Sequence, residues 1–153
     1  MPTNQTFIEH PIEFVLPRVF QIGTYEEEYE KLVVKYELGL LEVSNNDLKG
    51  AFEKLNSMYE EMHAHAEYVG MDIDGVRVWL HFFWNKDGTI AYLGYHLRPN
   101  SRNIDLKQFE VFLLSFIQVY RFPLLHEQPY SLYTSTSFPP YYKKNTAHSQ
   151  AAK

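Results

Sequence analysis

The loop that joins an apolar segment to a predicted helix carries the most suggestive chemistry in the chain. It contains Arg98, Ser101, Arg102 and Asn103. A helix N-terminus offers free N–H groups and the positive end of the helix dipole, and guanidinium groups bind carboxylates and phosphates. The loop therefore suggests a site for an anion or a phosphate-bearing ligand. A capping loop with solvated arginines explains the same residues without any ligand.

Histidines provide further candidates. His63 and His65 lie two residues apart on a predicted helix, so their side chains point to nearly opposite sides. The pairs His63–Glu67 and Glu61–His65 each supply only two metal ligands, and no third ligand is evident. We therefore expect no metal site and no cofactor.

Two other histidines, His81 and His96, fall on predicted paired strands without an obvious nucleophile or carboxylate partner. The chain has no GxSxG, P-loop or GxGxxG motif and no cysteine. We therefore expect no catalytic residues, although the absence of motifs does not exclude an enzyme.

Composition sets broad limits on the class of protein. The chain has 153 residues, of which 45% are hydrophobic and 16% aromatic, so it can form one core. Its net charge of -5 argues against a general nucleic-acid binder. We expect no signal peptide and no membrane span, because acids and prolines interrupt the first residues and no long apolar window follows. A cytoplasmic location is the default expectation.

Hydrophobic periodicity predicts the helices that must position these side chains. An apolar stripe predicts a first helix that starts at Thr24, with a capping box of Thr24 and Glu27. A longer stripe predicts a second helix over 45–69, with Ser44 and Asp47 as its capping box. Asn103 is the expected cap of a helix over 104–121 that is apolar almost all round.

The segments 75–84 and 89–97 are β-branched and aromatic, and an Asp-Gly turn between them predicts a hairpin. A last strand is expected over 130–138. The order from residue 45 is α-β-β-α-β, which predicts an α+β fold with a short antiparallel sheet packed by helices. We assign 44–142 to this domain, 1–43 to an N-terminal extension with one helix and a possible edge strand, and 143–153 to a disordered tail.

The order and several motifs resemble the C-terminal domain of the TonB family, over roughly residues 55–140. The stretch Gly75 to Gly88 is similar to the first hairpin of that domain. Further similarities are Ile90 after the turn, Asp105 at the next helix, Phe122-Pro123 at its exit and the strand from Tyr130 to Phe138. The resemblance implies the fold and a tendency to strand-mediated or dimeric interaction, without catalytic residues. We do not expect the membrane anchor and Pro-rich linker of TonB proteins here, so energy transduction is not implied.

Both faces of the predicted sheet are apolar. Alternate residues face opposite ways, so Trp79, His81 and Phe83 share one face while the other carries valines, Leu80 and Phe82. A two-layer domain covers only one face, and exposing the second is unusual for a monomer. The cover is expected to be residues 5–43, a second copy of the chain, or a ligand or protein partner.

Two functional hypotheses follow. The first is a non-catalytic protein-interaction module, with a protein partner or as a homodimer, that acts through a sheet edge or the aromatic face. Its expected residues are Trp79, His81, Phe83, Tyr130 and Tyr133. The second is a small-ligand binding protein or small enzyme that uses the loop from Arg98 to Asn103. Neither hypothesis involves nucleic acid or a membrane.

Overall fold

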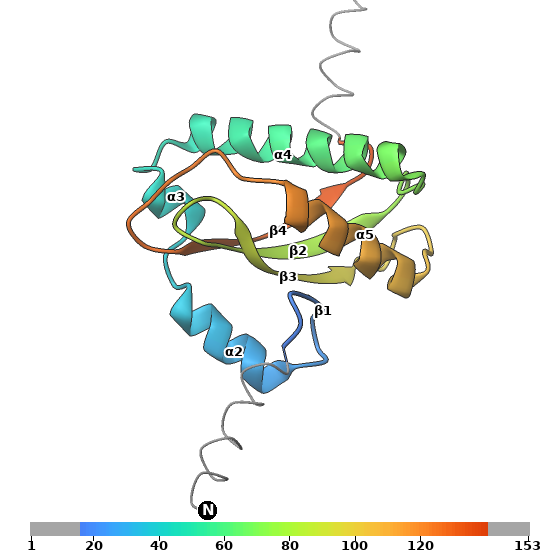
Figure 1. The fold of residues 1–153 in the computed structure, drawn as a ribbon, viewed down its shortest axis with the longest axis horizontal. Helices are drawn as coiled ribbons and strands as arrows, with labels where there is room; N and C mark the ends of the chain where they lie inside the picture. Colours follow the sequence, from blue (N-terminus) through green and yellow to red (C-terminus); the bar gives the residue numbers. More distant parts are fainter. Residues whose placement is uncertain (1–15, 141–153) are drawn as a thin grey trace, which may run out of the picture.

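The computed structural model describes residues 16–140 and arranges them around one mixed sheet with helices on both faces (Figure 1). Helices α4 and α5 lie on one side of the sheet and α2 on the other (Figure 1). The predicted α+β fold is therefore confirmed. The expected tail 143–153 lies outside the described residues, as does the start of the extension.

The sheet has four strands in the order β1-β3-β2-β4. Their bounds are β1 Val19–Gln21, β2 Arg77–Trp84, β3 Ile90–Leu97 and β4 Tyr130–Ser137. β2 pairs antiparallel with both β3 and β4, whereas β1 pairs parallel with β3. The predicted hairpin, last strand and N-terminal edge strand are all present. Gly88 has a φ of 89° at the hairpin turn, where glycine carries no Cβ penalty.

Helix α4 (Leu48–Val69) confirms the prediction of a long amphipathic helix. Its apolar stripe packs on the sheet through Leu55, Met58 and Met62. The predicted Ser44–Asp47 capping box is wrong, because Asp47 is itself the cap and accepts the Gly50 N–H at 3.0 Å.

Helix α5 (Leu106–Val119) begins later than expected. Its cap is Asp105, which accepts the Gln108 N–H at 3.1 Å, and not Asn103. A helix that is apolar almost all round is expected to be buried on more than one side, and this expectation is wrong, since Val111 is 67% exposed. The helix packs against the sheet and α4 on one side only, so its outer side faces solvent.

The N-terminal extension forms two helices instead of one, α2 (Glu26–Lys35) and α3 (Leu40–Val43). The predicted Thr24–Glu27 capping box does not form, because α2 starts at Glu26 and its N-cap residue is Tyr25, without a side-chain cap hydrogen bond. After α2 the chain passes beside β4, where Ser131 donates its backbone N–H to the Leu38 carbonyl at 2.9 Å and Gly39 forms an isolated parallel bridge with Ser131.

Candidate functional site

The second apolar face of the sheet is covered in part by the chain itself. Phe83 is fully buried, with the Tyr36 ring 5.4 Å and the Tyr29 ring 6.4 Å from it between centroids. Phe20 of β1 and Leu32 of α2 complete this second cluster. We call residues 16–36 the cover segment. The expected intramolecular cover is therefore confirmed for the end of the sheet that carries Phe83.

His81 joins the cover segment to the sheet. Its Nδ1 lies 2.7 Å from the Tyr29 hydroxyl, and its ring lies 4.1 Å from that of Phe83. Burial lowers the pKa of His81 to about 4 and raises the pKa of Tyr29 to about 12, so both groups are neutral near pH 7. A buried neutral imidazole bound to a phenol fits a structural role, and His81 lies beneath Tyr29 and not on an open surface.

Beyond the cover segment, three rings remain partly open to solvent. Trp79 lies between His96 and Tyr133, with centroid separations of 6.2 Å and 5.1 Å and nearly parallel ring planes. The His96 Nε2 lies 2.9 Å from the Tyr133 hydroxyl, and Tyr133 is 46% exposed. We call Trp79, His96 and Tyr133 the aromatic patch. Such rings offer a large contact area at low entropic cost to a partner.

Tyr130, which the sequence assigned to the same face, lies in the core instead. Its ring is 5.1 Å from that of Trp84, and its hydroxyl donates to the Leu124 carbonyl at 2.6 Å. Three positions separate Tyr130 from Tyr133, so strand alternation sends their side chains to opposite faces. The five residues expected to form one interaction face therefore lie in three places. The cover segment buries His81 and Phe83, the core holds Tyr130, and Trp79 and Tyr133 remain partly open to solvent.

The patch adjoins the free edge of β4. The Ser131 N–H points away from β2, toward Leu38. Backbone groups alternate in direction along an antiparallel strand, so those of Tyr133, Ser135 and Ser137 also point outward. None of these three residues uses its outward N–H or C=O in a backbone hydrogen bond within 16–140. This stretch of the edge carries no charged residue, whereas natural sheets usually protect their edges with charges, prolines or bulges.

The loop expected to hold an anion does not gather its residues at one point. Arg102 donates to the Asp72 backbone carbonyl and lies 4.0 Å from the Asp72 carboxylate. Ser101 accepts the Arg77 N–H at 2.9 Å and donates to the Arg102 carbonyl. Arg98 lines a different pocket, beside β4. Ser101 and Arg102 therefore hold the loop against Arg77 and Asp72, and neither of them caps α5.

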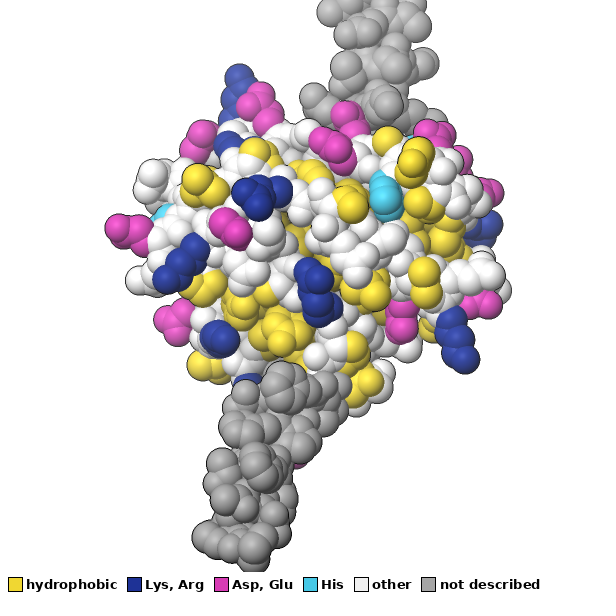
Figure 2. All heavy atoms as spheres, in the orientation of Figure 1, with side chains coloured by type: hydrophobic (Ala, Val, Ile, Leu, Met, Phe, Trp, Pro, Cys, Tyr) yellow, Lys and Arg dark blue, Asp and Glu magenta, His cyan; other side chains and the backbone are white. Residues whose placement is uncertain are grey.

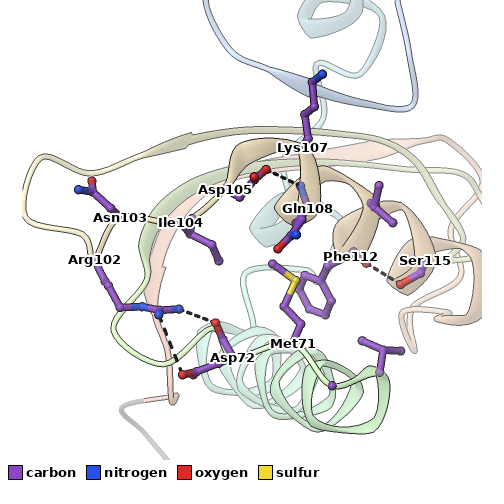
Figure 3. A pocket seen from close by; sticks show the side chains of 13 residues that line it. Met71, Asp72, Arg102, Asn103, Ile104, Asp105, Lys107, Gln108, Phe112 and Ser115 are labelled. Atoms are coloured by element: carbon purple, nitrogen blue, oxygen red, sulfur yellow. Dashed lines mark hydrogen bonds and ion pairs between the residues drawn. The ribbon is translucent and has the colours of Figure 1, made fainter.

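Arg102 and Asn103 border a groove of about 830 Å³ between the end of α4 and α5 (Figure 3). Met71 and Phe112 lie at its centre, with Gln108 above them (Figure 3). Lys107 points away from the Asp72–Arg102 pair (Figure 3), so the two cations of the groove do not converge. Hydrophobic side chains reach the surface among charged ones on the face drawn in Figure 2. The exposed hydrophobic residues of α4 and α5 include Tyr68, Val69, Val111 and Leu114.

The α4 histidines each have an ordinary partner. His63 Nε2 lies 2.6 Å from an Asp74 carboxylate oxygen, and His65 Nε2 lies 2.9 Å from the Ser115 hydroxyl. Within residues 16–140, no cluster of three or more histidine, aspartate or glutamate side chains could hold a metal ion. None of the described helices has the length and apolarity needed to cross a membrane.

No family model matches the chain, and comparison with curated proteins and with solved structures likewise finds no match. The resemblance to the TonB C-terminal domain remains a prediction from the sequence.

Proposed function

We propose that this chain is a non-catalytic protein-interaction module that receives an extended polypeptide segment on the outer edge of β4. The partner is another protein or a second copy of the chain. The segment adds a fifth strand to the sheet and contacts the aromatic patch with the side chains on that face. Backbone hydrogen bonds supply affinity in this mode, and contacts with alternate side chains supply selectivity.

The unpaired backbone groups of Tyr133, Ser135 and Ser137 carry the proposal. Each residue presents one outward donor and one outward acceptor, in the spacing that an added strand needs. The hydroxyl-bearing side chains of the edge bring no charge that would repel a partner. The aromatic patch lies on the same corner of the sheet, because Trp79 pairs with Ser135 across the β2–β4 ladder.

The groove between α4 and α5 supports a ligand-binding function less well. Its Arg102 already contacts Asp72, and its Asp105 caps α5. An anion that enters the groove would therefore have to compete with Asp72 for Arg102. The Asp105 carboxylate, being negative itself, would not bind the anion. On the β4 edge, by contrast, the outward backbone groups of Tyr133, Ser135 and Ser137 have no backbone hydrogen bond within residues 16–140 that a partner would have to displace.

The test is selection of extended peptides against the full chain, followed by NMR of the complex. A bound peptide is expected to protect the amide hydrogens of Tyr133, Ser135 and Ser137 from exchange. The variant Ser135→Pro removes one outward N–H without touching the β2 ladder, and we expect it to weaken binding by about 10-fold or more.

The matched control is Gln21→Pro, which changes the opposite edge strand β1 and should leave peptide affinity unchanged if both variants keep the wild-type far-ultraviolet spectrum. Selected peptides that bind without protecting the three β4 amides would refute the proposal. Light scattering on the wild-type chain alone distinguishes a second copy from a different partner.

A further inference from the structure

A second, smaller pocket lies beside β4. One of its lining residues is Arg98, which the sequence had grouped with Arg102 in a single anion site. Its volume is about 300 Å³, and it is lined by Arg98, residues of α4 and the β4 residues 134–137. Apolar contact comes from Phe52 and Leu55 of α4, while Asn56 and Tyr59 contribute an amide and a phenol. No carboxylate lines the pocket, so Arg98 gives its lining a single positive charge.

Tyr59 is the unusual group in this pocket. The residue is 7% exposed, and its hydroxyl oxygen has no hydrogen-bond partner among residues 16–140. Burial raises the pKa of Tyr59 to about 12, and the nearby Thr134 hydroxyl, although not in full hydrogen-bonding geometry, lowers it in part. The hydroxyl oxygen is closed off from solvent, so Tyr59 contributes a packed wall to the pocket and not a free donor.

Arg98 is also unengaged. Its backbone N–H bonds to the Arg77 carbonyl, but its guanidinium forms no ion pair with any residue of 16–140. By contrast, Arg102 from the same loop is held by Asp72. A free guanidinium at a pocket with hydroxyl and amide donors and no acid is the combination that binds an oxyanion.

We propose that the β4 pocket binds a small organic monocarboxylate. The carboxylate pairs with Arg98, while a compact apolar body lies against Phe52, Leu55 and Tyr59. The volume lies at the lower end of the range for ligand pockets, which favours a small molecule over a nucleotide. A single cation without a helix N-terminus matches one negative charge better than the two of a phosphate monoester.

The probe is benzoate, titrated into the isotopically labelled full chain near neutral pH and followed by NMR and calorimetry. We expect saturable binding with a Kd of about 1 mM. The largest shifts should fall on Tyr59 and on the β4 residues Ser135 and Ser137. Neutral benzamide and dianionic phenyl phosphate should each bind more weakly.

Arg98→Gln is expected to weaken benzoate binding by about 10-fold or more. The matched control Arg102→Gln removes the other arginine of the loop and should leave the Kd unchanged. If Arg98→Gln does not fold, the location of the benzoate-induced NMR shifts on the wild-type chain and the comparison with benzamide and phenyl phosphate decide the question.

Three results would overturn the inference. The first is the absence of saturable NMR shifts at a benzoate concentration of about ten times the expected Kd. The second is binding of benzamide as tight as that of benzoate, or tighter binding of phenyl phosphate. The third is loss of benzoate affinity in Arg102→Gln but not in Arg98→Gln. None of these results bears on peptide binding at the β4 edge, since that test measures protection of backbone amides.

Discussion

Tyr29 and His81 show how burial decides what a titratable side chain does. In the sequence His81 stands on a strand among aromatic residues and could be a base. In the structure its Nδ1 contacts the Tyr29 hydroxyl at 2.7 Å under the cover segment. The hydroxyl can donate to neutral imidazole, whereas protonated imidazole carries hydrogen on both nitrogens and offers no acceptor. The hydroxyl can also accept from a protonated ring, so it is burial under the cover segment that disfavours the charged form of His81.

This arrangement makes stability depend on pH. The pKa of His81 falls from 6.5 to about 4 on folding. Between those values the unfolded chain binds a proton that the folded chain does not bind, so the free energy of unfolding decreases as pH falls. The part due to His81 has a slope of at most about 1.4 kcal/mol per pH unit, and it disappears above the unfolded pKa.

Urea unfolding at several pH values checks this prediction. His81→Gln does not titrate but can still bond to Tyr29, so its stability should lose less between about pH 6.5 and pH 4 than that of the wild type. An identical pH dependence in the two proteins would assign the effect to other groups.

At the scale of elements, α2 is a helix with one packed side. Leu32 is 7% exposed and lies in the cluster with Phe83, whereas Val34 is 69% exposed two residues later. The helix has three glutamates in its first turn and Lys35 in its last, an arrangement that suits the helix dipole. Its place on the sheet therefore depends on the packed side and not on its surface charges.

Substituting the two sides of α2 separates these contributions. Leu32→Ala should destabilise the protein by about 2–5 kcal/mol, since it leaves a cavity against the sheet. Val34→Ala is the matched control and should change stability by less than about 0.5 kcal/mol. The measurement is denaturant unfolding, and equal effects of the two substitutions would contradict the packing of α2 described here.

The whole molecule has two hydrophobic clusters on one sheet. The larger one lies under α4 and α5, and the smaller one lies under the cover segment. Both use residues of β2, since Phe82 belongs to the larger cluster and Phe83 to the smaller. Loss of either cluster exposes the same strand, which couples the two layers.

We therefore expect one cooperative unfolding transition. Trp84 is fully buried in the larger cluster, and Trp79→Phe leaves it as the only tryptophan. Its fluorescence and the far-ultraviolet circular dichroism should change together in denaturant. An early circular dichroism change without a change in Trp84 fluorescence would mean that the cover segment unfolds first.

The sequence by itself determined the elements and their order, except for the short helix α3. The apolar stripe of α4, the hairpin of β2 and β3 and the strand β4 are local patterns, since periodicity depends on residues within a few positions of each other. The existence of two apolar sheet faces followed from the same alternation. Helix caps were less predictable, because Asp105 and Asn103 are both suitable residues and local geometry selects between them.

Only the tertiary structure decided which distant side chains meet. Arg98 and Arg102 stand in one loop, yet one borders the pocket with Tyr59 and the other contacts Asp72. Sheet order places β4 at an edge and leaves the backbone of Ser135 unpaired, which no local pattern encodes. These contacts join residues about 30 to 40 positions apart, and they exist because the strands pair in one order out of several that the same local patterns allow.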